Sequence, residues 1–236
     1  AMKNDIAYWA IVPAAGFGHR LGAPVPKQFL ELGRRTVLEH SLESLWSIPQ
    51  LKGLVLVSHG HPALASILER YAEHNMIRAP GGPERCHSVL NGLVALSELV
   101  NEDDWVLVHD AARPCVRHHD LHVLINKLAT HAVGGLLGTP VSDTMKRTDE
   151  QCLISATVER RGLWHALTPQ MFRYGLLKTA LETALGDGYE VTDEASAVEH
   201  AGYQPLMIEG HADNIKITQV EDLQLAEFFL QLQGRL

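Results

Sequence analysis

The sequence predicts an α/β fold in which a mostly parallel sheet is covered by helices on both faces. Short apolar runs rich in β-branched residues alternate along the chain with stretches whose apolar residues recur at helical spacing. Such alternation is typical of strand–helix–strand units, whose strands are parallel and buried on both sides. The length of 236 residues and the hydrophobic content of 46% also fit one large globular domain.

Six short apolar runs are the expected strands. The first could be mistaken for the core of a secretion signal, but it is short and leads into a glycine-rich loop with basic residues, which is typical of a folded site. No apolar run approaches the roughly 18 residues that a membrane-spanning helix needs. The expected strands span residues 7–12, 54–58, 105–109, 135–139, 205–208 and 215–218.

Capping residues and helical spacing predict the helices between these strands. A capping-box sequence at residues 36–39 begins a helix that is expected to end near residue 47. Residues 88–100 carry apolar side chains at helical spacing. A second capping-box sequence at residues 218–221 begins the last helix, which is expected to run through residue 232.

One segment departs from this alternation. Residues 141–159 are polar and poorly amphipathic, and two short alternating runs flank the sequence Asp149-Glu150-Gln151. This pattern predicts a hairpin that projects from the domain. The alternative is a long surface loop, but a structureless loop of that length is unusual in a compact domain. We therefore expect a projecting arm over residues 141–159.

The charge balance restricts the partners. Lys and Arg number 20 and Asp and Glu number 28, which gives a formal net charge of −8. Proteins that bind nucleic acid or anionic membranes generally need a basic surface, so we expect neither partner. A small anionic ligand remains compatible with the sequence, because a local cluster of cations can set the field inside a cleft.

Cysteine and histidine usage gives two further expectations. The three cysteines are far apart in the sequence and form no Cys-x-x-Cys pair, which argues for a reducing, cytoplasmic location rather than a disulfide framework. Three histidines come near a metal-ligand spacing, but histidines on a surface helix are common, so no metal site is expected. These residues are Cys86, Cys115, Cys152, His118, His119 and His122.

A glycine-rich loop follows the first expected strand, and its small residues let backbone amides approach an anion closely. A dinucleotide fingerprint is disfavoured because Leu21 stands at the third glycine, and the P-loop pattern is absent. What remains is a loop that carries Arg20 and, seven residues later, Lys27. Two cations beside a phosphate favour phosphoryl or nucleotidyl transfer. The alternative is a turn with two solvated cations.

Two later segments carry candidate ligand groups. The glycine pair 81–82 and Ser88 could contact a base edge; the alternative is a turn followed by an N-cap serine. Asp110 follows a strand, where open α/β sheets bind ligands, and could accept hydrogen bonds from a sugar or meet a metal. Arg113 could hold a phosphate or a polyol. The alternative for Asp110 and Arg113 is an ion pair that fixes a loop.

The remaining polar positions are ambiguous from the sequence. Thr168 lies in a Thr-Pro turn, and Thr192 and Asp193 are more typical of helix caps than of ligand contacts. Asp193 and Glu194 are more typical of a first-turn pair that interacts with the helix dipole than of a catalytic dyad. Lys216 lies between apolar neighbours in an expected strand, so it faces either solvent or a site.

In this order, the motifs closely resemble those of the 2-C-methyl-D-erythritol 4-phosphate cytidylyltransferase family of the non-mevalonate isoprenoid pathway. The resemblance runs from about residue 6 to residue 232. The glycine loop alone is shared with many nucleotidyltransferases, whereas the full set is specific to this family and its nearest relatives. The motifs are Pro13-Ala14-Ala15-Gly16-x-Gly-x-Arg20, Pro26-Lys27-Gln28, Gly81-Gly82-x-x-Arg85-x-x-Ser88, His109-Asp110-Ala111-Ala112-Arg113-Pro114, Asp143-Thr144, Thr168-Pro169-Gln170, Thr192-Asp193-Glu194-Ala195 and Asp213-Asn214-Ile215-Lys216.

The resemblance implies a fold and a reaction. The fold would be a single Rossmann-like nucleotidyltransferase domain over residues 1–236, with the arm clasping the second subunit of a homodimer. The reaction would convert CTP and 2-C-methyl-D-erythritol 4-phosphate into 4-diphosphocytidyl-2-C-methyl-D-erythritol and pyrophosphate, a step in isoprenoid precursor biosynthesis. Mg²⁺ would be bound mainly through the CTP phosphates, and no residue of the chain is assigned as a metal ligand.

The resemblance also implies roles for individual residues. Arg20 and Lys27 would stabilise the charge that develops at the α-phosphorus, and Arg160 and Lys216 would position the attacking phosphate. No catalytic base is required, because that phosphate is already ionised at neutral pH. The residues expected to hold the cytidine are Ala14, Ala15, Gly16, Gly82 and Ser88. Those expected to contact the methylerythritol phosphate or the adjacent ribose are Asp110, Arg113, Thr144, Thr168 and Thr192.

One position departs from the family pattern, and other functions stay open. Many members carry Asp where this chain has Pro83, and proline has no N–H to donate to a base. Ribitol 5-phosphate cytidylyltransferase is the nearest alternative, because sequence patterns alone do not separate two C5 polyol phosphates. A non-catalytic nucleotide-binding protein on the same fold is disfavoured by Arg20 and Lys27. An NAD-dependent oxidoreductase is disfavoured by the missing third glycine.

Overall fold

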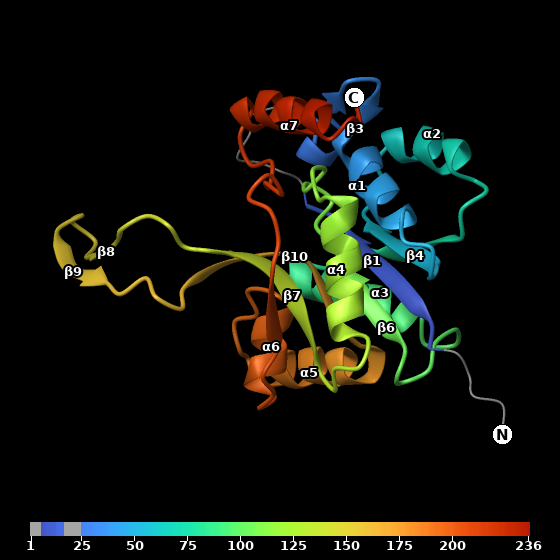
Figure 1. Ribbon diagram of the computed structural model, residues 1–236. Helices are drawn as coiled ribbons and strands as arrows, with labels where there is room; N and C mark the ends of the chain where they lie inside the picture. Colours follow the sequence, from blue (N-terminus) through green and yellow to red (C-terminus); the bar gives the residue numbers. More distant parts are fainter. Residues whose placement is uncertain (1–5, 17–24) are drawn as a thin grey trace.

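The computed structural model describes residues 6–16 and 25–236, and its centre is a seven-stranded sheet (Figure 1). The strands, in their order across the sheet, are β11 Leu206–Glu209, β7 Gly134–Pro140, β10 Trp164–Arg173, β6 Trp105–Val108, β1 Tyr8–Pro13, β4 Leu51–Ser58 and β5 Met76–Pro80. All neighbours pair in parallel except β10, which is antiparallel to both β6 and β7. The predicted mostly parallel sheet is confirmed.

Helices cover both faces of this sheet, as the sequence predicts. One apolar cluster packs the sheet against α1 Val37–Trp46, α2 Ala63–Arg70 and α4 His118–Leu128. A second cluster packs it against α3 Arg85–Ala95, α5 Tyr174–Gly186 and α6 Glu194–His200. Within β1, Ala10 and Val12 belong to the first cluster whereas Trp9 and Ile11 belong to the second. This alternation is the pattern of a strand buried on both faces.

A smaller third apolar cluster packs the C-terminal part of the chain against the loop that follows β6. It joins α7 Glu221–Leu232 to the hairpin β2 Glu31–Leu32 and β3 Arg35–Thr36, and to the loop after β6. The predicted strand 215–218 is wrong, because this segment belongs to none of the sheets. The Ile217 N–H instead donates to the Ala112 oxygen at 2.8 Å, which places Lys216 beside the loop after β6.

The two capping-box sequences behave differently. At α1, Thr36 Oγ1 accepts from the Glu39 N–H at 3.2 Å, and Glu39 Oε2 accepts from the Thr36 N–H at 2.6 Å, as predicted. At α7 the predicted box is wrong, since the helix begins at Glu221. There Asp222 Oδ2 accepts from the backbone N–H groups of Thr218 and Gln219, each at 2.9 Å.

The segment 141–159 forms the predicted hairpin, so the alternative of a structureless surface loop is wrong. β8 Met145–Thr148 pairs antiparallel with β9 Ile154–Val158, and this two-stranded sheet is separate from the central one. Figure 1 shows it projecting from the body of the molecule. None of the helices in the described part of the chain combines the length and apolar character that a membrane crossing requires.

Candidate active site

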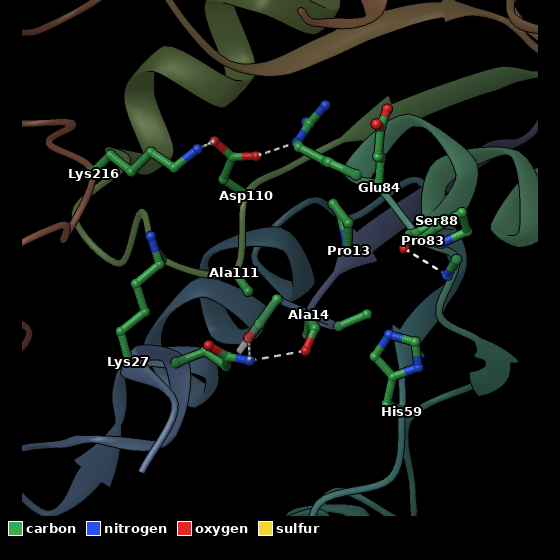
Figure 2. A pocket seen from close by; sticks show the side chains of 16 residues that line it. Pro13, Ala14, Lys27, His59, Pro83, Glu84, Ser88, Asp110, Ala111 and Lys216 are labelled. Carbon is green, nitrogen blue, oxygen red and sulfur yellow. Dashed lines mark hydrogen bonds and ion pairs between the residues drawn. The ribbon is translucent and has the colours of Figure 1, made fainter. Parts of the chain in front are cut away.

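A cavity of about 310 Å³ lies where β1 and β6 end (Figure 2). The strand order changes direction at β1, because β4 and β5 lie on one side of it and β6 on the other. Open α/β sheets bind ligands in the crevice at the carboxyl ends of the strands at such a point. Eight of the residues that the sequence predicts to hold the substrates or act in catalysis line this cavity: Ala14, Ala15, Gly16, Lys27, Gly82, Ser88, Asp110 and Lys216.

The cavity has two chemically different sides. In Figure 2 the side chains of Lys27 and Lys216 lie together on one side, near Asp110, whereas Ser88 and His59 lie on the other. The first side is therefore cationic, and we call it the lysine side. The second is walled by small residues and a hydroxyl, and we call it the serine side. This separation suits a ligand that carries phosphate at one end and an uncharged ring at the other.

Close packing explains the glycines of the serine side. A Cβ on Gly81 would lie 2.4 Å from the Ala15 Cβ, and a Cβ on Gly82 would lie 2.5 Å from the His87 Cβ. The Gly82 N–H donates to Ser88 Oγ at 3.0 Å. Ser88 is buried within α3, whose N-cap is Glu84, so the alternative of an N-cap serine is wrong.

Gln28, a motif residue without an expected role, joins the loop after β1 to the 3₁₀ helix η2 Lys27–Phe29. Its buried side chain donates from Nε2 to the backbone oxygens of Ala14 at 2.9 Å and of Gly16 at 3.0 Å. These bonds set where Lys27 stands relative to the loop. Arg20, the other cation predicted for this loop, lies outside the described residues.

Asp110 is the centre of a charge network on the lysine side. Its Oδ1 is 2.9 Å from Arg85 Nε, and its Oδ2 is 3.0 Å from Lys216 Nζ and 3.5 Å from Arg113 Nε. Burial alone would raise the pKa of Asp110, but Arg85, Lys216 and Arg113 outweigh it and hold the pKa far below its usual value. Asp110 is therefore a carboxylate whose two oxygens are both engaged by cations.

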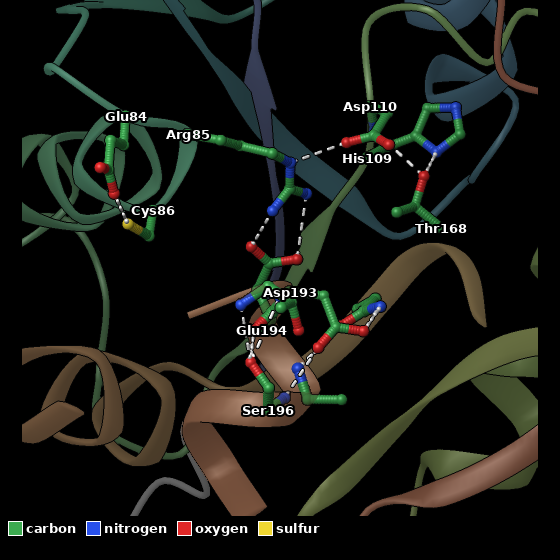
Figure 3. Close-up of polar contacts among 12 residues, drawn as sticks. Glu84, Arg85, Cys86, His109, Asp110, Thr168, Asp193, Glu194 and Ser196 are labelled. Carbon is green, nitrogen blue, oxygen red and sulfur yellow. Dashed lines mark hydrogen bonds and ion pairs between the residues drawn. The ribbon is translucent and has the colours of Figure 1, made fainter. Parts of the chain in front are cut away.

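Glu194 extends this network into the interior (Figure 3). Arg85 Nη1 is 2.6 Å from Glu194 Oε1, and Arg85 Nη2 is 3.1 Å from Glu194 Oε2, which is the bidentate geometry of an arginine–carboxylate pair. Burial alone would lower the pKa of Arg85, but Glu194 and Asp110 together raise it above the usual value. Burial raises the pKa of Glu194, and the Arg85 guanidinium acts in the opposite direction. Glu194 lies in the first turn of α6, as predicted, and its fully buried side chain also pairs with Arg85.

Thr168 supports Asp110 from behind. Burial lowers the pKa of His109 to about 4, so its ring is neutral at pH 7. His109 Nε2 lies 3.0 Å from the Arg113 oxygen and must donate to it, which leaves Nδ1 as an acceptor. Thr168 Oγ1, 2.9 Å from His109 Nδ1, therefore donates there and accepts from the Asp110 N–H at 3.1 Å.

Five of the predicted residues that the structure describes do not line this cavity. Arg113 and Thr168 lie behind Asp110 and contact it, and the other three are Thr144, Arg160 and Thr192. Thr144 and Arg160 lie near the base of the arm and line a separate surface hollow, where Arg160 Nη1 donates to the Ser142 oxygen. Thr192 precedes α6, and its N–H donates to Ser196 Oγ at 3.1 Å. Asp193 is the N-cap of α6 and forms a capping box with Ser196, as its sequence position predicts.

Sequence reasoning missed residues that the structure brings to the site. Arg85 stood inside a quoted motif, yet no pattern showed that its guanidinium would meet two carboxylates from distant segments. His59 lines the serine side but follows a strand without any recognisable motif. Within the described residues, the potential metal ligands that gather within 4.8 Å of one another are Glu84, Cys86 and His87. Burial raises the pKa of the Cys86 thiol, which disfavours the thiolate that a metal binds.

Comparison with known proteins agrees with this geometry. The profile of the IspD family, described as 2-C-methyl-D-erythritol 4-phosphate cytidylyltransferase, matches residues 8–232. A Vibrio vulnificus (strain YJ016) protein of that name is 50% identical over 223 residues, which cover 94% of this chain and 93% of that protein.

Solved structures agree as well. One described as 4-diphosphocytidyl-2C-methyl-D-erythritol synthase is 38% identical with a TM-score of 0.83, covering 95% of this chain and 99% of that one. The Francisella tularensis 2-C-methyl-D-erythritol 4-phosphate cytidylyltransferase is 33% identical with a TM-score of 0.82, covering 95% and 100%. The chain therefore belongs to the IspD family of 2-C-methyl-D-erythritol 4-phosphate cytidylyltransferases.

Proposed function

We propose that this chain transfers the cytidylyl group of CTP to 2-C-methyl-D-erythritol 4-phosphate, forming 4-diphosphocytidyl-2-C-methyl-D-erythritol and pyrophosphate for isoprenoid precursor synthesis. The observation that carries the proposal is one cavity with a lysine side and a serine side, at the switch point of a sheet that belongs to this family. An acceptor-phosphate oxygen bonds to the α-phosphorus, and the bond from that phosphorus to the β,γ-pyrophosphate breaks. Pyrophosphate leaves with the electron pair.

The serine side takes the cytidine. Ala14, Ala15, Gly16 and Gly82 leave a narrow space that backbone groups border, and Ser88 adds a hydroxyl. A pyrimidine fits such a space better than the larger purine, so the base is selected by size. Pro83 lines the same cavity and offers no N–H, so the base is held without a donor at that position.

The lysine side takes the phosphates. Lys27, together with Arg20, stabilises the charge that develops on the α-phosphate oxygens in the transition state. No general base is needed, since the second pKa of a phosphate monoester is about 6 and the attacking group is ionised at pH 7.

Lys216 positions the acceptor phosphate next to this centre, and Asp110 meets the acceptor or the ribose. Arg113 and Thr168 support Asp110 through their contacts with it. Thr192 lies outside the cavity wall, just before α6.

The donor set fits a magnesium ion that is held mainly by the CTP phosphates. Among the lining residues that are described, Asp110 and Glu84 carry carboxylates, and both Asp110 oxygens are engaged by cations. These residues provide too few free oxygen ligands to coordinate Mg²⁺ on their own, so most of its ligands would be oxygens of the triphosphate. When bound, Mg²⁺ neutralises charge on the triphosphate oxygens.

We also propose a homodimer in which the arm of each subunit completes the site of the other, bringing Thr144 and Arg160 to the partner's acceptor. The position of these residues outside the cavity of their own chain supports this. The exposed strand edges and apolar side chains of the arm, among them Leu153 and Ile154, favour burial against a second subunit. The cytoplasmic location remains a prediction from the cysteine pattern.

The test is pyrophosphate release from CTP and Mg²⁺ with each of two acceptors. We expect turnover with 2-C-methyl-D-erythritol 4-phosphate, much slower turnover with ribitol 5-phosphate, and slow turnover when ATP replaces CTP. A preference for ribitol 5-phosphate would assign the alternative acceptor, and comparable rates with ATP and CTP would contradict selection by base size. CTP binding without turnover on either acceptor would make the protein a nucleotide-binding protein rather than an enzyme.

A further inference from the structure

We infer that Glu194 is a positioning residue which, through Arg85, holds Asp110 and thereby sets where Lys216 stands in the cavity. The inference rests on the proposed role of Lys216 in placing the acceptor phosphate. Glu194 lies outside the cavity wall, whereas Arg85, Asp110 and Lys216 all line it. Figure 3 shows the guanidinium of Arg85 between the carboxylates of Glu194 and Asp110.

The contacts form one continuous chain from the interior to the cavity. Glu194 is fully buried at the start of α6, and its carboxylate accepts hydrogen bonds from both terminal nitrogens of Arg85. The third guanidinium nitrogen of Arg85, Nε, donates to Asp110 Oδ1 at 2.9 Å. The opposite oxygen, Asp110 Oδ2, is 3.0 Å from Lys216 Nζ. Lys216 itself is 38% exposed, so its position depends on this anchor more than on packing around it.

The number of cations around Asp110 makes the charge of Glu194 important for the position of Lys216. Arg85, Arg113 and Lys216 all contact Asp110, which is one carboxylate among three cations. Glu194 supplies the second negative charge. Its carboxylate accepts from Nη1 and Nη2 of Arg85, which orients the guanidinium so that Nε faces Asp110. Without that charge, the guanidinium would turn its strong terminal donors toward Asp110 and draw the carboxylate out of the orientation in which Oδ2 contacts Lys216. Lys216 would then lose its fixed position.

A purely structural role for Glu194 makes a different prediction. In that case the loss of its charge would lower stability and would affect both substrates alike. In the positioning role, the substitution weakens binding of the acceptor, and it does so only while Lys216 is present. A double-mutant cycle separates the two roles, because coupling between two residues appears as non-additivity.

The experiment measures acceptor binding and turnover in Glu194→Gln, Lys216→Ala and the double variant. The dissociation constant of methylerythritol phosphate is determined by calorimetry, in the presence of Mg²⁺ and a CTP analogue with a non-cleavable α,β-bridge. We expect Glu194→Gln to weaken acceptor binding about tenfold, which corresponds to about 1.4 kcal/mol. We expect CTP binding to change less than twofold. In the Lys216→Ala background the same substitution should weaken acceptor binding less than twofold.

Equal losses in both backgrounds would overturn the positioning role while leaving Lys216 in the acceptor site. If Lys216→Ala alone leaves acceptor binding and turnover unchanged, the proposed role of Lys216 fails, and the inference fails with it. Glu39→Gln is the matched control, because Glu39 is also buried and pairs with an arginine, Arg70, at 2.5 Å but lies outside the cavity wall. It should lower stability without changing acceptor affinity.

Glu194→Gln leaves the half-buried guanidinium of Arg85 with a single carboxylate partner and is therefore at risk of misfolding. The paired replacement Arg85→Met with Glu194→Leu removes both charges together and keeps the cycle measurable. This pair also frees Asp110 Oδ1, so we expect it to weaken acceptor binding by a similar factor, again only while Lys216 is present. Acceptor affinity equal to wild type in the folded paired variant would contradict the inference.

Discussion

At the scale of single residues, the lysine side shows how a protein with a net charge of −8 can still receive a triphosphate. Lys27, Lys216 and Arg85 lie in the wall of one cavity against Asp110 and Glu84, so the local balance is opposite in sign to that of the whole chain. A cleft with low-dielectric walls focuses such a local field. What decides function here is therefore the placement of a few cations rather than the total charge.

Lys27 provides the first prediction at this scale. In the role that we propose for Lys27, its contacts strengthen as negative charge develops at the α-phosphorus. Lys27→Ala should therefore lower kcat by roughly 10²-fold or more, whereas CTP binding weakens less. Steady-state kinetics with varied CTP, together with CTP titration by calorimetry, measures both effects. A variant with unchanged kcat and a raised KM alone would assign Lys27 to ground-state binding instead.

His109 provides a pH prediction. Burial lowers its pKa in the folded protein to about 4 from the ordinary value of 6.5, so the unfolded chain binds the proton more readily between these values. The free energy of unfolding should therefore fall as pH decreases from about 6.5 to about 4, by up to about 3 kcal/mol from this group. Urea denaturation at several pH values measures the slope.

The variant that checks this pH prediction is His109→Gln. It removes the buried titrating ring and should flatten the slope, whatever its cost at neutral pH. An undiminished slope in His109→Gln would show that the acid sensitivity of the fold arises elsewhere.

At the scale of elements, the sequence patterns predicted five of the seven strands of the central sheet. β1, β4, β6, β7 and β11 were visible as apolar runs, whereas β5 and β10 were not, since β5 is a short mixed run and the outer half of β10 is exposed. Residues 215–218 alternate like a strand but make a single backbone bond across to the loop after β6. Local pattern cannot distinguish such a segment from a paired strand, because pairing depends on distant partners.

The candidate site shows the same division. The glycine loop, Ser88 and Asp110 could be predicted because each follows a strand or carries a motif. Glu194 could not be given a role from local pattern, since its position in the first turn of α6 is equally typical of a dipole-stabilising residue. Its partner Arg85 is 109 positions away in the chain. The sequence pattern identified residues that line the cavity, and tertiary packing determined which residues hold them.

The two capping-box sequences give a prediction at this scale. Thr36→Ala removes a hydroxyl that accepts from the Glu39 N–H, so it should lower the free energy of unfolding by about 1 kcal/mol. Thr218→Ala should lower the free energy of unfolding clearly less, because Asp222 still accepts from the N–H groups of residues 218 and 219. Chemical denaturation of both variants measures the difference. Equal losses would mean that the Thr218 hydroxyl caps α7 in solution.

At the scale of the whole molecule, the arm separates two groups of the proposed site. Lys27 and Lys216 lie in the wall of one cavity, whereas Thr144 and Arg160 lie on the segment that projects from the body (Figure 1). A two-fold dimer in which the arms are exchanged would bring the groups together and would cover the exposed edges of β8 and β9. The central claim is therefore that each active site combines the cavity of one subunit with the arm of its partner.

Subunit mixing tests this claim most directly. Lys27→Ala and Arg160→Ala are prepared as separate, nearly inactive dimers, mixed in equal amounts and allowed to exchange. If Arg160 acts on the partner's cavity, each mixed dimer regains one intact site and half the dimers are mixed. Cytidylyltransferase activity should then rise to about one quarter of that of the wild type.

The matched control mixes Lys27→Ala with Lys216→Ala. Both residues belong to the cavity of the same chain, so their mixed dimers contain no intact site and activity should not rise. A dimer with exchanged arms predicts recovery of about one quarter in the first mixture and none in the second. No recovery in the first mixture, with exchange confirmed by mass spectrometry of differently tagged subunits, would contradict it and would confine Arg160 to its own chain.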